Sequence, residues 1–470
     1  MAPGAGQRGR AAAARGAPAR AGWGESLTGP AAGLSNIGSS RRAPARTDRR
    51  EGGRQLSTEP TPRPATDDAA EESTAVPLLA PRDGLPPTIE NSTQLVEYAQ
   101  ALREGSGPVA VDAERASGYR YGQRAYLVQL RRNGSGTGLV DPVPLPDLSV
   151  LQEAIADAEW VLHAANQDLP CLAEIGLVPA KLFDTELAAR LAGLPRVGLG
   201  AVVESLLGFS LQKGHSAADW STRPLPEEWL VYAALDVEVL VDLRDALAAI
   251  LAEQGKTEWA RQEFEAILAA GPPAPRVDPW RRTSGVHGLR SRRQLGMLRA
   301  LWEARDELAR RRDVAPGRVL PDSAMVSAVQ ADPRNEGALL ELPVFRGRAN
   351  RRLVAHWFQA LVRGKEVPED ELPPHSRTGD GPPPVNRWAD RDPAAATRLQ
   401  AARAGLAEVA EKHAVPVENV VSPDLVRRLM WHPPEPRDRD AVVAALRAGG
   451  AREWQVDLTA DLLTDAATRA

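Results

Sequence analysis

Cysteine is nearly absent from this chain of 470 residues, with Cys171 as its single example. One thiol cannot form an internal disulfide or a cysteine-based zinc site, so the sequence predicts a protein of a reducing compartment, the cytoplasm. No apolar run approaches the roughly 18 residues of a membrane helix, because charged residues interrupt each one. No apolar core follows the Arg41-Arg42 pair, so a twin-arginine signal is not predicted.

Lysine is also scarce, and five of the 58 basic residues are lysines. Arginine, alanine, glycine and proline are abundant instead, which is typical of GC-rich coding and makes arginine alone weak evidence for a binding surface. The net charge is −4, but residues 1–56 carry +7, which leaves about −11 for residues 57–470. A nucleic-acid-binding surface must therefore be local.

The length predicts two to four domains. Pro- and Gly-rich breaks, and a first segment without sustained periodicity, divide the chain. The predicted order is a disordered tail over 1–85, an α/β domain over 86–270, a linker over 271–287, a helical domain over 288–370, a linker over 371–385 and a second helical domain over 386–470.

Within the α/β segment, short apolar runs of strand type alternate with helical patterns. The runs at 108–112, 125–130 and 138–141 have only turns between them, which predicts an antiparallel meander, and a further strand is expected at 160–163. Helices are predicted from about Leu148, Asp168 and Leu199, and residues 225–255 predict one or two more. The two helical segments contain similar stretches at 313–322 and 413–424, which suggests a duplicated module.

Asp112 and Glu114 end the first strand run two residues apart, so alternation places both carboxylates on one face. Such a pair resists burial unless a cation balances it. Asp168 follows the strand run that ends at His163 and opens a helix. Each feature alone also fits a plain structural explanation, namely a charged strand end and a favourable acid at a helix start.

Tyr232 and Asp236 lie four residues apart and share one face of a predicted helix, beside Ala233 and Ala234. A half-buried tyrosine with a solvated aspartate is the plain alternative, but small alanines allow close approach to a sheet. Four carboxylates and one tyrosine in this order suit a two-metal site for Mg²⁺ or Mn²⁺, because both ions prefer oxygen ligands. The sequence contains no P-loop, no dinucleotide-binding fingerprint and no His-Glu-x-x-His motif.

These motifs resemble the ribonuclease D family of DEDDy-type 3′–5′ exonucleases. The match comprises Val-Asp112-Ala-Glu114, His163-Ala-Ala-Asn-Gln-Asp168 and Tyr232-Ala-Ala-Leu-Asp236, with Phe183-Asp184-Thr185 and Asp219-Trp220 between them. The resemblance implies a ribonuclease-H-like fold in which Asp112, Glu114 and Asp236 hold one metal, Asp112 with Asp168 serves the other, and Tyr232 positions the water. Ala113 departs from the threonine more usual between the two acids.

The segment from Leu295 to Ala309, with the Val314-Ala-Pro316 and Val319-Leu-Pro-Asp322 stretches after it, resembles a helicase-and-RNase-D C-terminal (HRDC) domain, and the second helical segment resembles it more weakly. Residues 281–312 carry a local charge near +7, which predicts phosphate contacts through residues such as Arg290, Arg292 and Arg293, although a solvated helix face explains the same charges.

The predicted function is a metal-dependent 3′–5′ exoribonuclease that hydrolyses tRNA or other stable-RNA precursors and releases nucleoside 5′-monophosphates. No membrane association and no obligate protein partner are expected. Two alternatives stay open: a DNA 3′–5′ exonuclease, because only contacts to the 2′-hydroxyl separate the two substrates, and a nucleic-acid-binding scaffold without activity.

Overall fold

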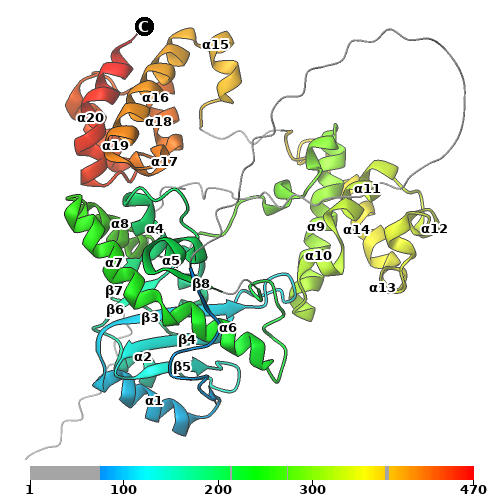
Figure 1. The fold of residues 1–470 in the computed structure, drawn as a ribbon. Coiled ribbons are helices and arrows are strands. Elements are labelled where there is room, and N and C mark those ends of the chain that lie inside the picture. Colours follow the sequence, from blue (N-terminus) through cyan, green and yellow to red (C-terminus); the bar gives the residue numbers. More distant parts are fainter. Residues whose placement is uncertain (1–74, 212–213, 272–273, 376–380, 470) are drawn as a thin grey trace, which may run out of the picture. The chain divides into compact units, whose positions relative to one another are not determined.

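Three of the runs predicted as strands pair into an antiparallel meander at the centre of a mixed sheet (Figure 1). The computed structural model describes residues 75–211, 214–271, 274–375 and 381–469. In sheet order, β2-β5-β4-β3-β6-β7, the outer pairs β2-β5, β3-β6 and β6-β7 are parallel. The strands of this sheet are β2 (Thr88–Ile89), β3 (Ser106–Arg115), β4 (Ala125–Asn133), β5 (Gly136–Val140), β6 (Glu159–Leu162) and β7 (Lys181–Asp184).

Helices cover this sheet, and the predicted helical pattern over 225–255 forms two of them, separated at Val239. The first, α6, packs against β3, β4 and β5 through Ala233 and Ala234, which are fully buried against Leu127 and Leu139. The helices of this α/β part are α1 (Ser92–Glu104), α2 (Ser149–Ala154), α3 (Leu169–Glu174), α4 (Thr185–Leu191), α5 (Leu199–Leu207), α6 (Glu227–Glu238), α7 (Leu240–Glu253) and α8 (Thr257–Ala270).

The segment predicted to be unstructured up to residue 85 contains a short strand. β1 (Val76–Leu78) pairs in parallel with β8 (Phe209–Leu211). A three-residue strand that finds its partner far along the chain leaves no periodic pattern in the sequence, which is why the prediction missed it. Residues 1–74 lie outside the described residues, so the disordered tail stays a prediction for them.

Beyond residue 271 the described residues form helices and no strand, as predicted. The α-helices of this part are α9 (Arg292–Arg312), α10 (Pro316–Val319), α11 (Asp322–Ala331), α12 (Glu336–Leu340), α13 (Arg348–Arg352), α14 (Val354–Glu366), α15 (Trp388–Arg391), α16 (Pro393–His413), α17 (Val417–Val420), α18 (Pro423–Trp431), α19 (Arg439–Ala448) and α20 (Glu453–Thr468). None of the described helices has a stretch long and apolar enough to span a membrane.

The two helical segments repeat one succession of elements. α9 and α16 both have 21 residues and end at a residue with a left-handed backbone, Asp313 (φ 48°) and Ala414 (φ 49°). In each segment a four-residue helix and then a longer helix follow, α10 and α11 in the first and α17 and α18 in the second. The similarity seen at 313–322 and 413–424 therefore corresponds to equivalent turns.

Both predicted linkers contain buried side chains among their described residues. Trp280 is 2% exposed and packs with Leu298 in the core beneath α9, and Leu372 is 3% exposed. Prolines and glycines interrupt helices, which explains the linker prediction, but an apolar ring or side chain beside them is still removed from water. The predicted domain boundaries stay predictions.

Candidate active site

Asp112 and Glu114 lie near the end of β3, on the face of the sheet that α6 covers. Their cross-strand partners on β4 are Gln129 and Leu127, and paired residues of neighbouring strands place their side chains on the same face. Gln129 is fully buried, and its amide has no hydrogen-bond partner in the described part of the chain. On β4 the acids therefore face one apolar side chain, Leu127, and one amide, Gln129, which has no partner among the described residues.

α6 places Tyr232 and Asp236 beside the carboxylates of Asp112 and Glu114. The helix follows Pro226, whose missing N–H costs nothing at a helix start, and has acids in its first turn, where they interact favourably with the helix dipole. One carboxylate oxygen from each of Asp112, Glu114 and Asp236 can be chosen so that all three lie within 4.8 Å of one another. The predicted strand pair and the predicted helix face thus meet at one point.

Asp168 reaches this site from the loop that follows β6. The loop turns at Ala164, whose φ is 59°, and a short 3₁₀ turn leads to Asp168 at the start of α3. Asp168 makes no side-chain cap bond to its own helix. It is 6% exposed and lines a cavity of about 360 Å³ with Asp112 and Asp236. All four predicted carboxylates and Tyr232 line this cavity.

Asp184 fixes the loop that carries Asp168. Its carboxylate accepts hydrogen bonds from the N–H groups of Ala164 at 3.1 Å and Ala165 at 2.9 Å. It also caps α4 by accepting a hydrogen bond from the backbone N–H of Glu186. Burial raises the pKa of Asp184 to about 6, against the lowering effect of these backbone bonds. The carboxylate is therefore ionised at neutral pH, the state that can accept every one of these bonds.

The four carboxylates disfavour one another's ionisation. Burial, and then the charges of Asp112, Asp236 and Asp168, raise the pKa of Glu114 to about 10. Burial and Asp112 raise the pKa of Asp168 to about 8, and the pKa values of Asp112 and Asp236 are also raised, chiefly by burial. A site with this excess of buried negative charge favours cations, which can replace the bound protons.

The Tyr232 hydroxyl stays protonated at any physiological pH, because burial and the charges of Asp236 and Glu114 raise its pKa. The ring of His215 approaches the Tyr232 ring edge-on, with 5.8 Å between the centroids. The hydroxyl is therefore a neutral group among carboxylates, suited to orienting a small molecule through a hydrogen bond.

The sequence-based prediction missed Arg115, which also lines the cavity and lies 3.5 Å from the Asp168 carboxylate. Its place next to Glu114 in the sequence was the available signal. Arg292 and Arg293, predicted to contact phosphates, donate to the backbone carbonyls of Leu372 and Lys365, respectively, and their phosphate contacts stay a prediction. The side chain of Arg290 is exposed.

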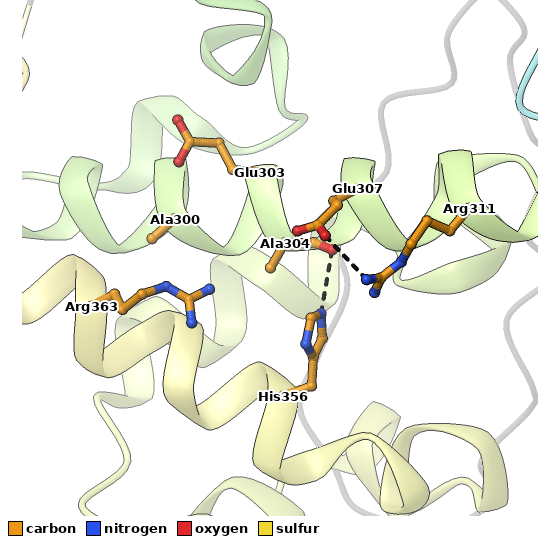
Figure 2. Close-up of a pocket in the computed structure, with 7 residues that line it drawn as sticks. All are labelled: Ala300, Glu303, Ala304, Glu307, Arg311, His356 and Arg363. Atoms are coloured by element: carbon orange, nitrogen blue, oxygen red, sulfur yellow. Dashed lines mark hydrogen bonds and ion pairs between the residues drawn. The ribbon is translucent and has the colours of Figure 1, made fainter.

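A larger cavity, of about 530 Å³, lies in the first helical segment between α9 and α14. Figure 2 shows its lining, in which Glu307 pairs with Arg311 at 3.1 Å and the His356 ring lies 3.3 Å from the carbonyl of Ala304. The Glu303 carboxylate pairs with Arg299. Because these acids have basic partners on their own helix, the cavity lacks the concentrated charge of the carboxylate site.

The sequence matches three family models. Residues 86–252 match a 3′–5′ exonuclease model, residues 294–361 match an HRDC domain model, and residues 381–467 match a model for a 3′ to 5′ exonuclease C-terminal domain. The first of these ranges contains every residue of the carboxylate site. The two helical segments match different models, although they share a succession of elements.

A ribonuclease D from Gluconacetobacter diazotrophicus is 32% identical over 333 residues, which cover 69% of this chain and 81% of that protein. The chain belongs to the ribonuclease D family. The assignment confirms the family predicted from the three motifs, and with it the prediction of a hydrolytic 3′–5′ exoribonuclease.

Two solved structures are similar to this chain over most of its length. A crystal structure of a protein from Bifidobacterium adolescentis has 38% identity and a TM-score of 0.77, covering 83% of this chain and 99% of that one. Escherichia coli RNase D, described as an exoribonuclease involved in structured RNA processing, has 25% identity and a TM-score of 0.60, covering 81% of this chain and 98% of that one. The predicted α/β fold followed by helical domains is confirmed.

Proposed function

We propose that the carboxylate cluster is the active site of this ribonuclease D relative and that it uses two divalent ions, Mg²⁺ or Mn²⁺. The observation that carries the proposal is the approach of Asp112, Glu114 and Asp236 to within 4.8 Å in a mostly buried site. These three would hold one ion, and Asp112 with Asp168 would hold the other. Bound ions of this kind lower the pKa of the attacking water and stabilise charge on the scissile phosphate.

The protein's own groups have separate tasks in this scheme. The Tyr232 hydroxyl orients the attacking water in line with the 3′ oxygen that leaves, and hydrolysis of that bond releases a nucleoside 5′-monophosphate. Asp184 holds the loop that positions Asp168. Glu114 and Asp168 are 8% and 6% exposed, and partial exclusion of bulk water strengthens the electrostatic interactions around them.

We propose tRNA or other stable-RNA precursors as the substrates and the cytoplasm as the location, with no obligate protein partner. The support is the relative from Escherichia coli, described as acting in structured RNA processing, and the HRDC match. The exposed Arg290 at the start of the first helical segment is a candidate phosphate contact.

The test is the degradation of matched 5′-labelled RNA and DNA with Mg²⁺, Mn²⁺ or EDTA, and of a tRNA precursor with a 3′ extension. Wild type is compared with Asp112→Ala and Tyr232→Phe, and with Asp245→Asn as an exposed control in the same domain. The expected result is a metal-dependent ladder on RNA that Asp112→Ala abolishes and Asp245→Asn leaves unchanged. Activity on DNA alone would indicate a DNA exonuclease, and binding without cleavage would indicate a scaffold.

A further inference from the structure

The side chain of Arg115 points into the carboxylate site, although it cannot bind a metal. It lines the same cavity as Asp112, Asp168 and Asp236, and its guanidinium lies 3.5 Å from the Asp168 carboxylate. A guanidinium is always protonated and has no lone pair to offer a cation. A fixed positive charge in a site that collects cations competes with them unless it also serves an anion.

An irregularity of the sheet accompanies this placement. The pairing of β3 with β4 shifts register between Glu114 and Arg115, so that Glu114 is opposite Leu127 and Arg115 is opposite Ala125. Irregularities of this kind occur next to active sites, where they redirect a side chain. Regular alternation would send the two neighbouring side chains to opposite faces, yet both line the cavity.

The guanidinium of Arg115 has few partners for its donors. Among the described residues it makes the one ion pair with Asp168, at a distance beyond the usual range of N–H···O hydrogen bonds. Arg223 in the same domain shows what a structural arginine does: it binds both carboxylate oxygens of Asp141, at 2.6 and 2.8 Å, and the carbonyls of Tyr126 and Trp220. Arg115 is 26% exposed and has donors to spare.

We propose that Arg115 binds a phosphate of the RNA 3′ end or of the released nucleotide, and that Asp168 holds the guanidinium aside until a divalent ion binds Asp168. This inference rests on the proposed function. A planar guanidinium suits the oxygens of a phosphate, to which it donates two parallel hydrogen bonds. Because the ion and Arg115 share Asp168, the ion releases the guanidinium to the phosphate, and binding of ion and phosphate is mutually favourable.

The experiment compares wild type with Arg115→Gln, Arg115→Lys and the exposed control Arg103→Gln on α1. Three quantities are measured: kcat and KM on single-stranded RNA over a range of salt, the Kd of adenosine 5′-monophosphate with Mn²⁺ or EDTA, and the Kd of Mn²⁺ alone by electron paramagnetic resonance. The last two need no cleavage.

For Arg115→Gln we expect KM to rise about tenfold or more, with a smaller change in kcat. The slope of log(kcat/KM) against the logarithm of the salt concentration should become shallower by about 0.7, the value for one phosphate contact on a single strand. Arg115→Lys should recover part of the loss, and Mn²⁺ alone should bind equally or more tightly, because its competitor for Asp168 is gone. If Arg115 only supported the structure of the site, Arg115→Gln would weaken Mn²⁺ binding instead.

The nucleotide measurement separates the two sources of phosphate. If Arg115→Gln binds the monophosphate more weakly than wild type with Mn²⁺, and the two proteins do not differ in EDTA, Arg115 contacts the terminal phosphate. If only KM for RNA changes, Arg115 contacts an upstream phosphate of the chain. Wild-type values of KM, nucleotide Kd and salt dependence in Arg115→Gln would overturn the inference. A wild-type protein that cleaves no RNA would overturn the proposed function, and the nucleotide and Mn²⁺ measurements would still decide the role of Arg115.

Discussion

The carboxylate of Asp184 accepts a hydrogen bond of 2.9 Å from the backbone N–H of Ala165, and this bond joins the end of β7 to the loop that positions Asp168. Asp184 also accepts hydrogen bonds from the backbone N–H groups of Ala164 and of the first turn of α4. One buried side chain therefore satisfies backbone donors from two segments, and the position of a proposed metal ligand depends on it.

Asp184→Ala should lose both stability and activity. The buried N–H groups of Ala164 and Ala165 would lack partners, and α4 would lose its cap, so we expect a loss of about 2–4 kcal/mol in the free energy of unfolding. Urea unfolding and kcat measure the two effects. The matched control is Asp438→Ala, which removes the exposed N-cap of α19 and should cost about 1 kcal/mol without changing kcat. A fully active Asp184→Ala protein would contradict this role.

Tyr232→Phe should lower kcat about a hundredfold on RNA and leave the Kd of Mn²⁺ unchanged, because the hydroxyl is proposed to orient water and not to hold metal. Steady-state kinetics and metal titration separate the two. Tyr98→Phe is the control, since the Tyr98 hydroxyl donates to the carbonyl of Leu130 and lies outside the cavity lining. A parallel loss of metal affinity in Tyr232→Phe would argue that the hydroxyl acts on the metal site itself.

Asp236→Asn should make the metal-free protein more stable and the metal-loaded protein less so. Burial and neighbouring charges raise the pKa of Asp236, so its ionised form is disfavoured in the folded state, and a neutral amide removes that cost. We therefore expect Asp236→Asn to raise the free energy of unfolding in EDTA.

Thermal unfolding of wild type and Asp236→Asn, with EDTA or with Mn²⁺, measures this exchange. Wild type should gain stability from Mn²⁺, and Asp236→Asn should gain less. Asp245→Asn, which replaces an exposed acid, is the control for the loss of one negative charge. A less stable Asp236→Asn protein in EDTA would show that the carboxylates do not repel one another appreciably.

Because of His163, the free energy of unfolding should decrease in acid. Burial lowers the pKa of His163 to about 4, and its Nδ1 lies 2.9 Å from the Thr185 hydroxyl. Between pH 4 and 6.5 the unfolded chain binds a proton that the folded chain does not, so stability rises with pH through this window and is lost as pH falls. The full difference corresponds to about 3 kcal/mol.

Urea unfolding of wild type and His163→Asn at pH values from 4 to 7 isolates this contribution as the difference between the two proteins. The difference should change with pH below 6.5 and be constant above it. His287→Asn, at an exposed position, should follow wild type throughout. A difference that is independent of pH would show that His163 is protonated equally in both states.

The sequence predicted the parts of the site that depend on local periodicity. Asp112 and Glu114 share a strand face, and Tyr232 and Asp236 share a helix face, because strand and helix periods act over a few residues. The buried Ala233 and Ala234 were also foreseen as the close contact between helix and sheet.

Other features depend on partners far along the chain, and local patterns do not reveal them. The pairing of β1 with β8, the sheet irregularity beside Arg115 and the hydrogen bonds from Ala164 and Ala165 to Asp184 all join distant segments. The family resemblance included Asp184 but gave it no task, which the structure supplies. Arg292 and Arg293 likewise bind carbonyls far along the chain, those of Leu372 and Lys365, which the local charge pattern does not reveal.

The placement of Tyr232 and Asp236 on the single helix α6 has an evolutionary consequence. One inserted residue between them would turn one side chain about 100° further around the helix axis and separate the two groups. A chain that gains or loses a residue between this tyrosine and this aspartate therefore loses the geometry of the site, so the interval must be inherited as a unit.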